Sequence, residues 1–181
     1  SIAIGTLALI VIGYLGYRQF MWKPSNEKSK ESYFIALNAI TNEDSNIAMD
    51  TSKAGAKTDP IKKLQKSVKK YDGKIGGEVS KYLLASQYMR KGKYKEALTL
   101  LENVSVEDTY VSVEVIGLQG DCQSELNKFE EAYELYKTAA NMNANNFTSP
   151  MYLFKAGLVA EQLKKYDLAK AHFETIAVQY P

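Results

Sequence analysis

The chain has 181 residues and a formal net charge of +2, which is long enough for a domain with a sizeable core. The near-neutral charge excludes a bulk electrostatic attraction to nucleic acid. One cysteine, Cys122, and one histidine, His172, exclude an intrachain disulfide and a cysteine-based zinc site within this sequence. With four prolines and almost no alternating valine-rich runs, the composition predicts an all-α fold.

Residues 1–22 form an apolar segment, "SIAIGTLALIVIGYLGY" followed by "RQFMW". Its uncharged part approaches the ~20 residues that cross a bilayer, so we predict a transmembrane helix, with residues missing upstream of Ser1. Aromatic and basic side chains at its end predict a membrane interface: Tyr14, Tyr17, Arg18, Phe20, Trp22 and Lys23. A signal peptide is disfavoured because "GYRQFMWKP" is too bulky for cleavage.

Residues 23–77 are predicted to hold a juxtamembrane helix, a loop and a basic helix. Tyr33, Phe34, Leu37 and Ile40 have near-helical spacing, and the helix could continue from the apolar segment through a kink at Pro24. Asp59 and Pro60 have the pattern of a helix start. The following helix carries six lysines and one aspartate between residues 60 and 74, which predicts a solvated face or, alternatively, contact with anionic lipid. This region could also be a degenerate first hairpin.

A short phrase occurs three times: "GKYKEAL" from Gly92, "NKFEEAY" from Asn127 and "KKYDLAK" from Lys164. The phrases are 35 and 37 residues apart, and a period in this range indicates stacked helical hairpins. The predicted helix pairs are 78–91 with 94–104, 111–126 with 129–141, and 150–163 with 166–178. They give three repeats, 78–110, 111–149 and 150–181.

Small residues recur twelve positions before the alanine of each phrase. The pairs are Ala85 with Ala97, Gly120 with Ala132, and Gly157 with Ala169. We predict that the two helices of each hairpin cross closely at these pairs, because a bulky side chain would separate the backbones. A large residue follows each alanine by four positions and is predicted to pack against the next hairpin: Leu101, Tyr136 and Phe173.

This pattern resembles the tetratricopeptide repeat (TPR) over about residues 78–181. Tyr88 and Pro181 also match the repeat, whereas Gln123 and Ala160 depart from it. The resemblance implies a concave face lined by the first helix of each repeat. The corresponding positions are Val79, Tyr82, Ser86, Met89 and Arg90, then Glu114, Gly117, Asp121, Ser124 and Glu125, then Met151, Phe154, Leu158, Glu161 and Gln162. These side chains could bind a partner, or the apolar ones could pack against neighbouring loops or a capping helix.

The order of parts, and the phrase "NNFTSPMYLFKAGLVAEQLKKYDLAKAHFETIAVQYP", resemble bacterial YfgM-like proteins of the Bacteroidetes type. That resemblance implies an ancillary subunit of the SecYEG translocon, anchored in the inner membrane by a single span with its TPR domain in the periplasm. The implied partners are the Sec channel subunits, a membrane-anchored chaperone resembling prolyl isomerases, emerging secretory polypeptides and the lipid bilayer. The alternative is a membrane-tethered TPR adaptor for another cell-envelope or secretion assembly.

Two arguments about orientation disagree. Basic residues after the span, Arg18, Lys23, Lys28 and Lys30, favour a cytoplasmic repeat domain by the positive-inside rule. The family resemblance favours the periplasm, which we adopt as the expectation.

The sequence indicates neither an enzyme nor a cofactor. Cys122 is predicted to be a small buried core residue, and His172 a partly exposed packing residue. Acidic pairs such as Glu130 and Glu131 lie at predicted helix starts, where they favour the helix dipole.

Overall fold

The computed structural model describes residues 2–45 and 59–180, and among these all regular structure is helical. The chain divides into two compact units, Ser1–Ser80 and Lys81–Pro181, and helix α4 (Ile75–Arg90) contributes residues to both. The predicted all-α class agrees with these elements. Most of the loop predicted before Asp59, residues 46–58, lies outside the described residues.

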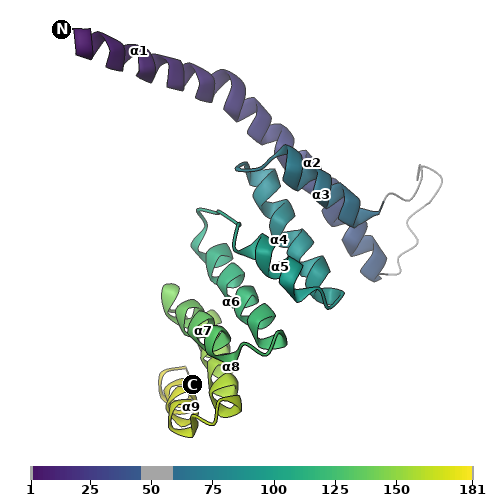
Figure 1. Cartoon of the computed structure of the whole chain (residues 1–181), viewed down its shortest axis with the longest axis vertical. Coiled ribbons are helices and arrows are strands. Elements are labelled where there is room, and N and C mark those ends of the chain that lie inside the picture. The colour runs from purple at the N-terminus through teal and green to yellow at the C-terminus, as the bar shows by residue number, and fades with distance from the viewer. Residues whose placement is uncertain (1, 46–58, 181) are drawn as a thin grey trace. The chain divides into compact units, whose positions relative to one another are not determined.

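The first unit begins with continuous helical backbone: α1 (Ile2–Tyr17), the π-helical segment η1 (Arg18–Trp22) and α2 (Lys23–Ser45) (Figure 1). Pro24 has no N–H to donate and its ring crowds the preceding turn, which accounts for the irregular turn just before it. The irregularity predicted at Pro24 therefore lies at Arg18–Trp22. The helix predicted after it is present, although Phe34, assigned to its apolar face, is 56% exposed, whereas Ile40 is buried.

None of the helices formed by the described residues has both the length and the apolar character that a membrane crossing requires. The transmembrane helix predicted over residues 1–22 is therefore not supported. Its predicted interface residues lie at the end of α1, in η1 and at the start of α2, where Lys23 Nζ donates to Gln19 Oε1 at 2.8 Å.

Helix α3 (Pro60–Lys70) packs against α2 within the first unit. Its start is the one predicted, because the Asp59 carboxylate accepts a hydrogen bond from the Ile61 N–H at 3.0 Å and Pro60 occupies the first turn. The start of α4 lies against α2, where Gly76 N–H donates to Ser29 Oγ at 2.9 Å. A Cβ on Gly76 would lie 1.8 Å from the Ser29 carbonyl oxygen, so this contact requires glycine.

The second unit is a row of antiparallel helices, of which α6 to α9 are seen side by side in Figure 1. After α4 come α5 (Tyr94–Leu101), α6 (Thr109–Glu125), α7 (Phe129–Met142), α8 (Thr148–Gln162) and α9 (Tyr166–Gln179). The three predicted pairs are all present. Helix α5 ends at Leu101 instead of residue 104, because the next residues turn and Asp108 caps α6 by accepting from Val111 N–H at 2.9 Å.

The repeated phrase encodes the turn of each hairpin. Its first residue has a left-handed backbone in all three copies: Gly92 (φ 69°), Asn127 (φ 58°) and Lys164 (φ 59°). The lysine that follows donates its backbone N–H to a carbonyl five residues back, at 2.8–2.9 Å, from Lys93 to Tyr88, Lys128 to Gln123 and Lys165 to Ala160. This hydrogen bond satisfies a carbonyl at the end of the first helix and reverses the chain.

The core of the second unit follows the predicted small residues. Ala85, Ala97 and Ala132 are fully buried, and Ala169 is 3% exposed. Gly120 and Gly157 lie against rings of their own hairpins, because an added Cβ would come within 2.7 Å of Tyr136 and 2.5 Å of Phe173. The close helix contact is therefore between a glycine and the aromatic of the facing helix.

The turn at Lys164 predicts a stabilising substitution. A left-handed backbone costs a side-chain-bearing residue about 1–2 kcal/mol, and glycine removes that cost while adding unfolded-state entropy. Lys164→Gly should therefore stabilise the chain by about 0.5–1 kcal/mol, measured by chemical denaturation. The matched control is Lys165→Gly, whose φ is −92°, and it should lose stability. Equal effects of the two substitutions would contradict the assigned turn.

Candidate partner-binding surface

The predicted concave-face residues differ in how far they are exposed. On α4, Tyr82, Ser86 and Met89 are half-buried and Arg90 is exposed, while Val79 is half-buried in the part of α4 that belongs to the first unit. On α6, Asp121 is half-buried and Glu125 is exposed. On α8 the apolar members are open, with Phe154 52%, Leu158 42% and Met151 36% exposed, and Glu161 is exposed beside them.

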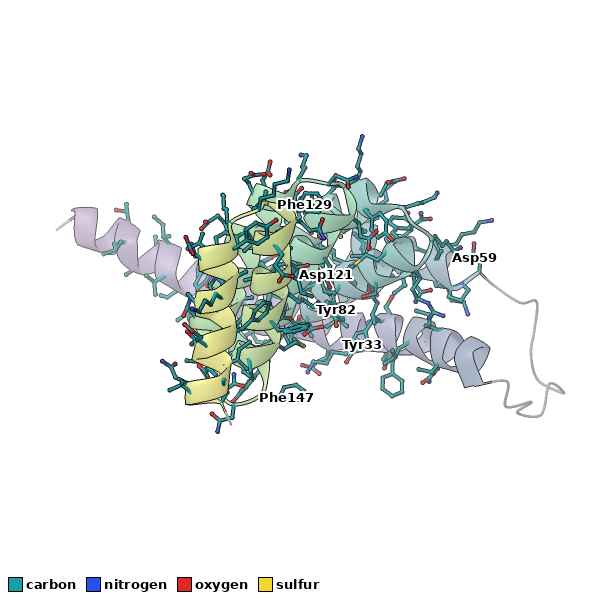
Figure 2. All side chains as sticks on the ribbon, turned by 90° about the horizontal axis from the view of Figure 1, so that it is seen from below. Tyr33, Asp59, Tyr82, Asp121, Phe129 and Phe147 are labelled. Carbon is teal, nitrogen blue, oxygen red and sulfur yellow. The ribbon has the colours of Figure 1, made fainter. Side chains whose placement is uncertain are left out.

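Asp121 is already occupied by groups from neighbouring helices. Its carboxylate accepts from Tyr136 Oη of α7 at 2.6 Å and from Lys155 Nζ of α8 at 2.7 and 2.9 Å. Lys155 also lies over the rings of Tyr136 and Tyr152, 5.6 and 5.7 Å from their centroids. Asp121, which is labelled in Figure 2, therefore joins two hairpins.

Two tyrosines complete this contact between hairpins. The rings of Tyr136 and Tyr152 stack with centroids 6.4 Å apart, and Tyr152 Oη donates to Glu114 Oε2 at 3.2 Å. Burial, and then the neighbouring Asp121 or Glu114 carboxylate, raises the pKa of each tyrosine far above its ordinary value. Both phenols therefore remain hydrogen-bond donors at neutral pH. Burial and the charge of Glu114 also raise the pKa of Tyr82.

Sequence reasoning missed Lys155 and the acceptor roles of Asp121 and Glu114. One signal was present: Lys155 is the one cation in the α8 sequence "TSPMYLFKAGLVAEQ", and the residues around it from Met151 to Ala160 are otherwise apolar. A lone cation in such a helix needs an anionic partner. Its spacing from the preceding repeat does not identify Asp121, because that pairing depends on how two hairpins stack.

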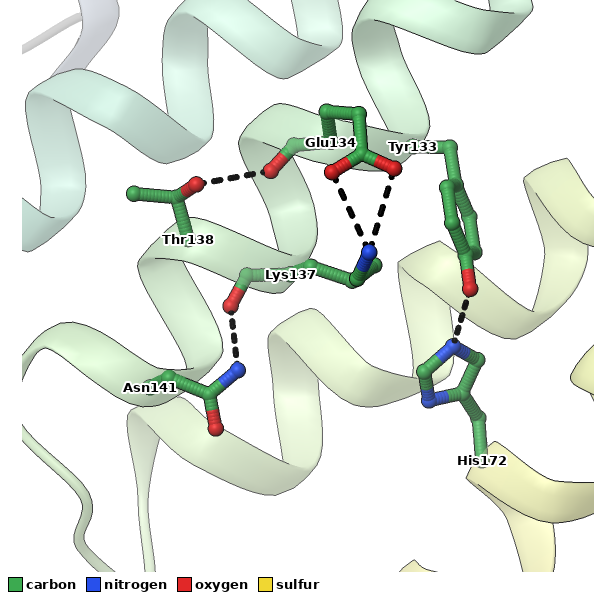
Figure 3. Close-up of polar contacts among 6 residues, drawn as sticks. All are labelled: Tyr133, Glu134, Lys137, Thr138, Asn141 and His172. Carbon is green, nitrogen blue, oxygen red and sulfur yellow. Dashed lines mark hydrogen bonds and ion pairs between the residues drawn. The ribbon is translucent and has the colours of Figure 1, made fainter.

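The single cysteine and the single histidine of the sequence both pack against other side chains. Cys122 is buried among Ala85, Ala97, Leu101 and Val115, as predicted, and burial raises its pKa to about 11, with further contributions from Asp121 and Glu125. The thiol therefore stays protonated and unreactive at neutral pH. His172 is half-buried, and its Nε2 lies 3.0 Å from Tyr133 Oη (Figure 3). Among the described residues, no three acidic, histidine or cysteine side chains gather to hold a metal.

Comparisons with known proteins define the class of the second unit. Residues 113–146 and 152–181 each match the tetratricopeptide repeat. A crystal structure of MamA is similar to this chain with a TM-score of 0.55 and 22% sequence identity, over 66% of each chain. No curated protein matches the chain. At this level of identity the likeness to MamA concerns the fold alone, and it agrees with the two repeat matches.

The second unit thus contains TPR repeats and folds as a short helical solenoid. The predicted second and third repeats overlap the two matched segments, whereas the predicted first repeat, 78–110, lies outside them. Its hairpin nevertheless has the same turn and the same buried small pair.

The close approach of Gly117 to Tyr152 gives a prediction about the interface between repeats. A Cβ on Gly117 would lie 2.1 Å from the Tyr152 ring, which is 2% exposed and held by Glu114. Gly117→Ala should therefore cost about 1–3 kcal/mol of unfolding free energy by overpacking. In a Tyr152→Val background the same change should instead stabilise, by up to about 1 kcal/mol, because alanine favours a helix. Denaturation curves showing the same effect in both backgrounds would contradict this contact.

His172 gives a prediction about pH. Burial, and then the charge of Lys137, lowers the pKa of His172 below its ordinary 6.5, so the unfolded chain binds a proton more readily than the folded chain. The unfolding free energy should therefore fall as pH decreases below about 6.5, and stay unaffected by this group above it.

The control for this pH effect is His172→Gln, which removes the titrating ring and keeps a polar side chain beside Tyr133. Chemical denaturation between pH 7.5 and pH 5.5 should show a smaller loss of stability for this variant than for the wild type. An identical pH dependence of the two proteins would exclude His172 as the cause.

Proposed function

We propose that this protein is a non-enzymatic adaptor that binds another protein along the first helices of its TPR unit. The observation that carries the proposal is a contrast between buried and exposed repeat positions. The buried pairs are small in every repeat, Ala85 with Ala97, Gly120 with Ala132 and Gly157 with Ala169. At one exposed position of the first helices the residue changes from Arg90 to Glu125 to Gln162.

Packing explains why the buried positions repeat, since any larger side chain there would separate the helices. Packing places no such demand on the exposed positions. A row whose charge changes along the solenoid is suited to recognising one extended or helical partner with a complementary order of charges. TPR domains that share this architecture serve many functions, so the partner must be found by experiment.

Site-specific photo-crosslinking in intact cells tests this proposal. A photoreactive amino acid at Arg90 or at Glu125 should give discrete adducts of defined mass. The matched controls are Glu134 and Asn141, which are exposed on α7, a second helix. Adducts that are equally abundant at all four positions, or absent from Arg90 and Glu125, would contradict binding along the first helices.

We further propose that the adaptor is attached to a membrane through α1. The support is the apolar surface of this helix, where Leu7, Leu9, Ile10 and Ile12 are 63–71% exposed. A helix that is apolar on all sides is stabilised by burial on all sides, which a lipid environment provides better than a single protein groove. Membrane fractions from the crosslinked cells should contain the chain, and Leu9→Lys with Ile12→Lys should move it to the soluble fraction.

The resemblance to YfgM-like proteins supports a finer proposal, that the partners are the Sec channel and a periplasmic chaperone at the bacterial inner membrane. The alternative is an adaptor for a different envelope or secretion assembly. Mass spectrometry of the adducts at Arg90 and Glu125 distinguishes them. Sec channel subunits or a prolyl-isomerase-like chaperone would support the first, and recurrent adducts with other envelope proteins would support the second.

A further inference from the structure

The end face of the last hairpin, formed by Phe154 and Leu158 of α8 and Phe173 of α9, repeats a surface that is covered one hairpin earlier. The equivalent residues of the α6–α7 hairpin, 37 positions earlier, are Gly117, Asp121 and Tyr136. All three contact α8: Gly117 faces the Tyr152 ring, Asp121 pairs with Lys155, and Tyr136 stacks on Tyr152. The same place on the α8–α9 hairpin is therefore shaped to receive one more helix.

The burial of the residue equivalent to Phe173 in each hairpin depends on whether another hairpin covers it. Leu101 of the first hairpin is fully buried and packs in one cluster with Val115 and Cys122 of α6. Tyr136 of the second is 4% exposed beneath α8. Phe173 of the third is half-buried, and it rests against Phe154 with ring centroids 5.8 Å apart. Beside it an open hollow of about 440 Å³ is lined by Tyr166, Ala169, Lys170, Phe173 and Ala177 together with two glutamates.

The two internal interfaces show which helix fits which face. The first face presents Tyr82, which lies in one cluster with Val115 and Leu118 of α6, both smaller than tyrosine and uncharged. The second presents Gly117 and Asp121, and α8 meets it with Tyr152 and Lys155. Where the face has a large residue, the incoming helix has a medium-sized one. Where the face has a glycine, the incoming helix has a large residue.

The end face is of the first kind. Phe154 takes the place of Tyr82, so a tyrosine opposite it would be overpacked. Leu158 takes the place of Asp121, so a lysine opposite it would lose its anionic partner and be partly desolvated. A helix that fits this face has a medium-sized apolar residue opposite Phe154 and a leucine opposite Leu158. These two residues of the incoming helix are three positions apart, as Val115 and Leu118 are in α6.

We infer that the end face formed by Phe154, Leu158 and Phe173 docks an amphipathic helix of a partner protein whose contact residues follow the α6 pattern rather than the α8 pattern. The argument uses the repeated interface and does not depend on the exposed row Arg90, Glu125 and Gln162. The two proposals can therefore be contradicted independently, because the crosslinking positions Arg90 and Glu125 lie on other hairpins.

The test uses two peptides from this chain as probes. One has the sequence of residues 109–126 with Cys122→Ala, and the other has the sequence of residues 148–163. Fluorescence anisotropy with the full chain should show the first peptide binding about tenfold more tightly than the second. The second peptide is expected to bind more weakly because its tyrosine would be overpacked and its lysine would have no anionic partner. Failure of both peptides to bind, or equal binding of both, would overturn the inference.

A face-exchange variant localises the binding. Phe154→Gly with Leu158→Asp converts the end face to the kind that α8 covers, so the peptide preference should reverse. Both changed residues are exposed, and circular dichroism verifies that the variant remains folded. An unreversed preference in the folded variant would place the peptide elsewhere and overturn the inference. Self-association of the wild type that Phe154→Asp abolishes, with neither peptide binding, would make a second copy the occupant and overturn it as well.

Discussion

The packing of the second unit depends on one constraint. Neighbouring helices approach each other so closely at certain positions that no side chain fits there. Gly117 lets the Tyr152 ring reach the backbone of α6, and this places the Tyr152 hydroxyl on Glu114 and the Lys155 ammonium on Asp121. The ion pair and the ring stack depend on that spacing, because a methyl group at residue 117 would push α8 outward. The polar contacts are thus set by packing and fix the register in which the third hairpin rests on the second.

Much of this unit could be predicted from the sequence, because the features involved are local. The three phrases predict where each hairpin turns, and the small residues twelve positions before each phrase alanine predict the buried pairs. Cys122 and His172 occupy the environments predicted for them. The period of an amphipathic helix and the residues that form a turn extend over only a few neighbouring positions. Both can therefore be recognised in a single sequence.

Contacts between hairpins could be predicted only in part. Leu101 and Tyr136 pack toward the next hairpin as predicted, but their partners and the polar contacts could not be read from the sequence. Asp121 and Lys155 are 34 residues apart, and their pairing depends on the angle at which α8 crosses α6 and α7. The sequence suggested an acidic inner surface on α6, whereas Asp121 and Glu114 accept hydrogen bonds from Lys155, Tyr136 and Tyr152. At the other end of the chain, a run of apolar residues followed by aromatic and basic ones predicted a membrane span over residues 1–22, and no described helix meets the requirements for one.

The central claim is that each hairpin is stabilised by the neighbour that covers it, as expected of a helical solenoid. Native-state hydrogen exchange of the full chain measures this directly, residue by residue. We expect the slowest exchange in α6 and α7, which have a hairpin on each side, and markedly faster exchange in α9, whose outer face is open. Uniform protection from α6 through α9 would contradict the account, because α9 would then owe its stability to something other than a covering neighbour.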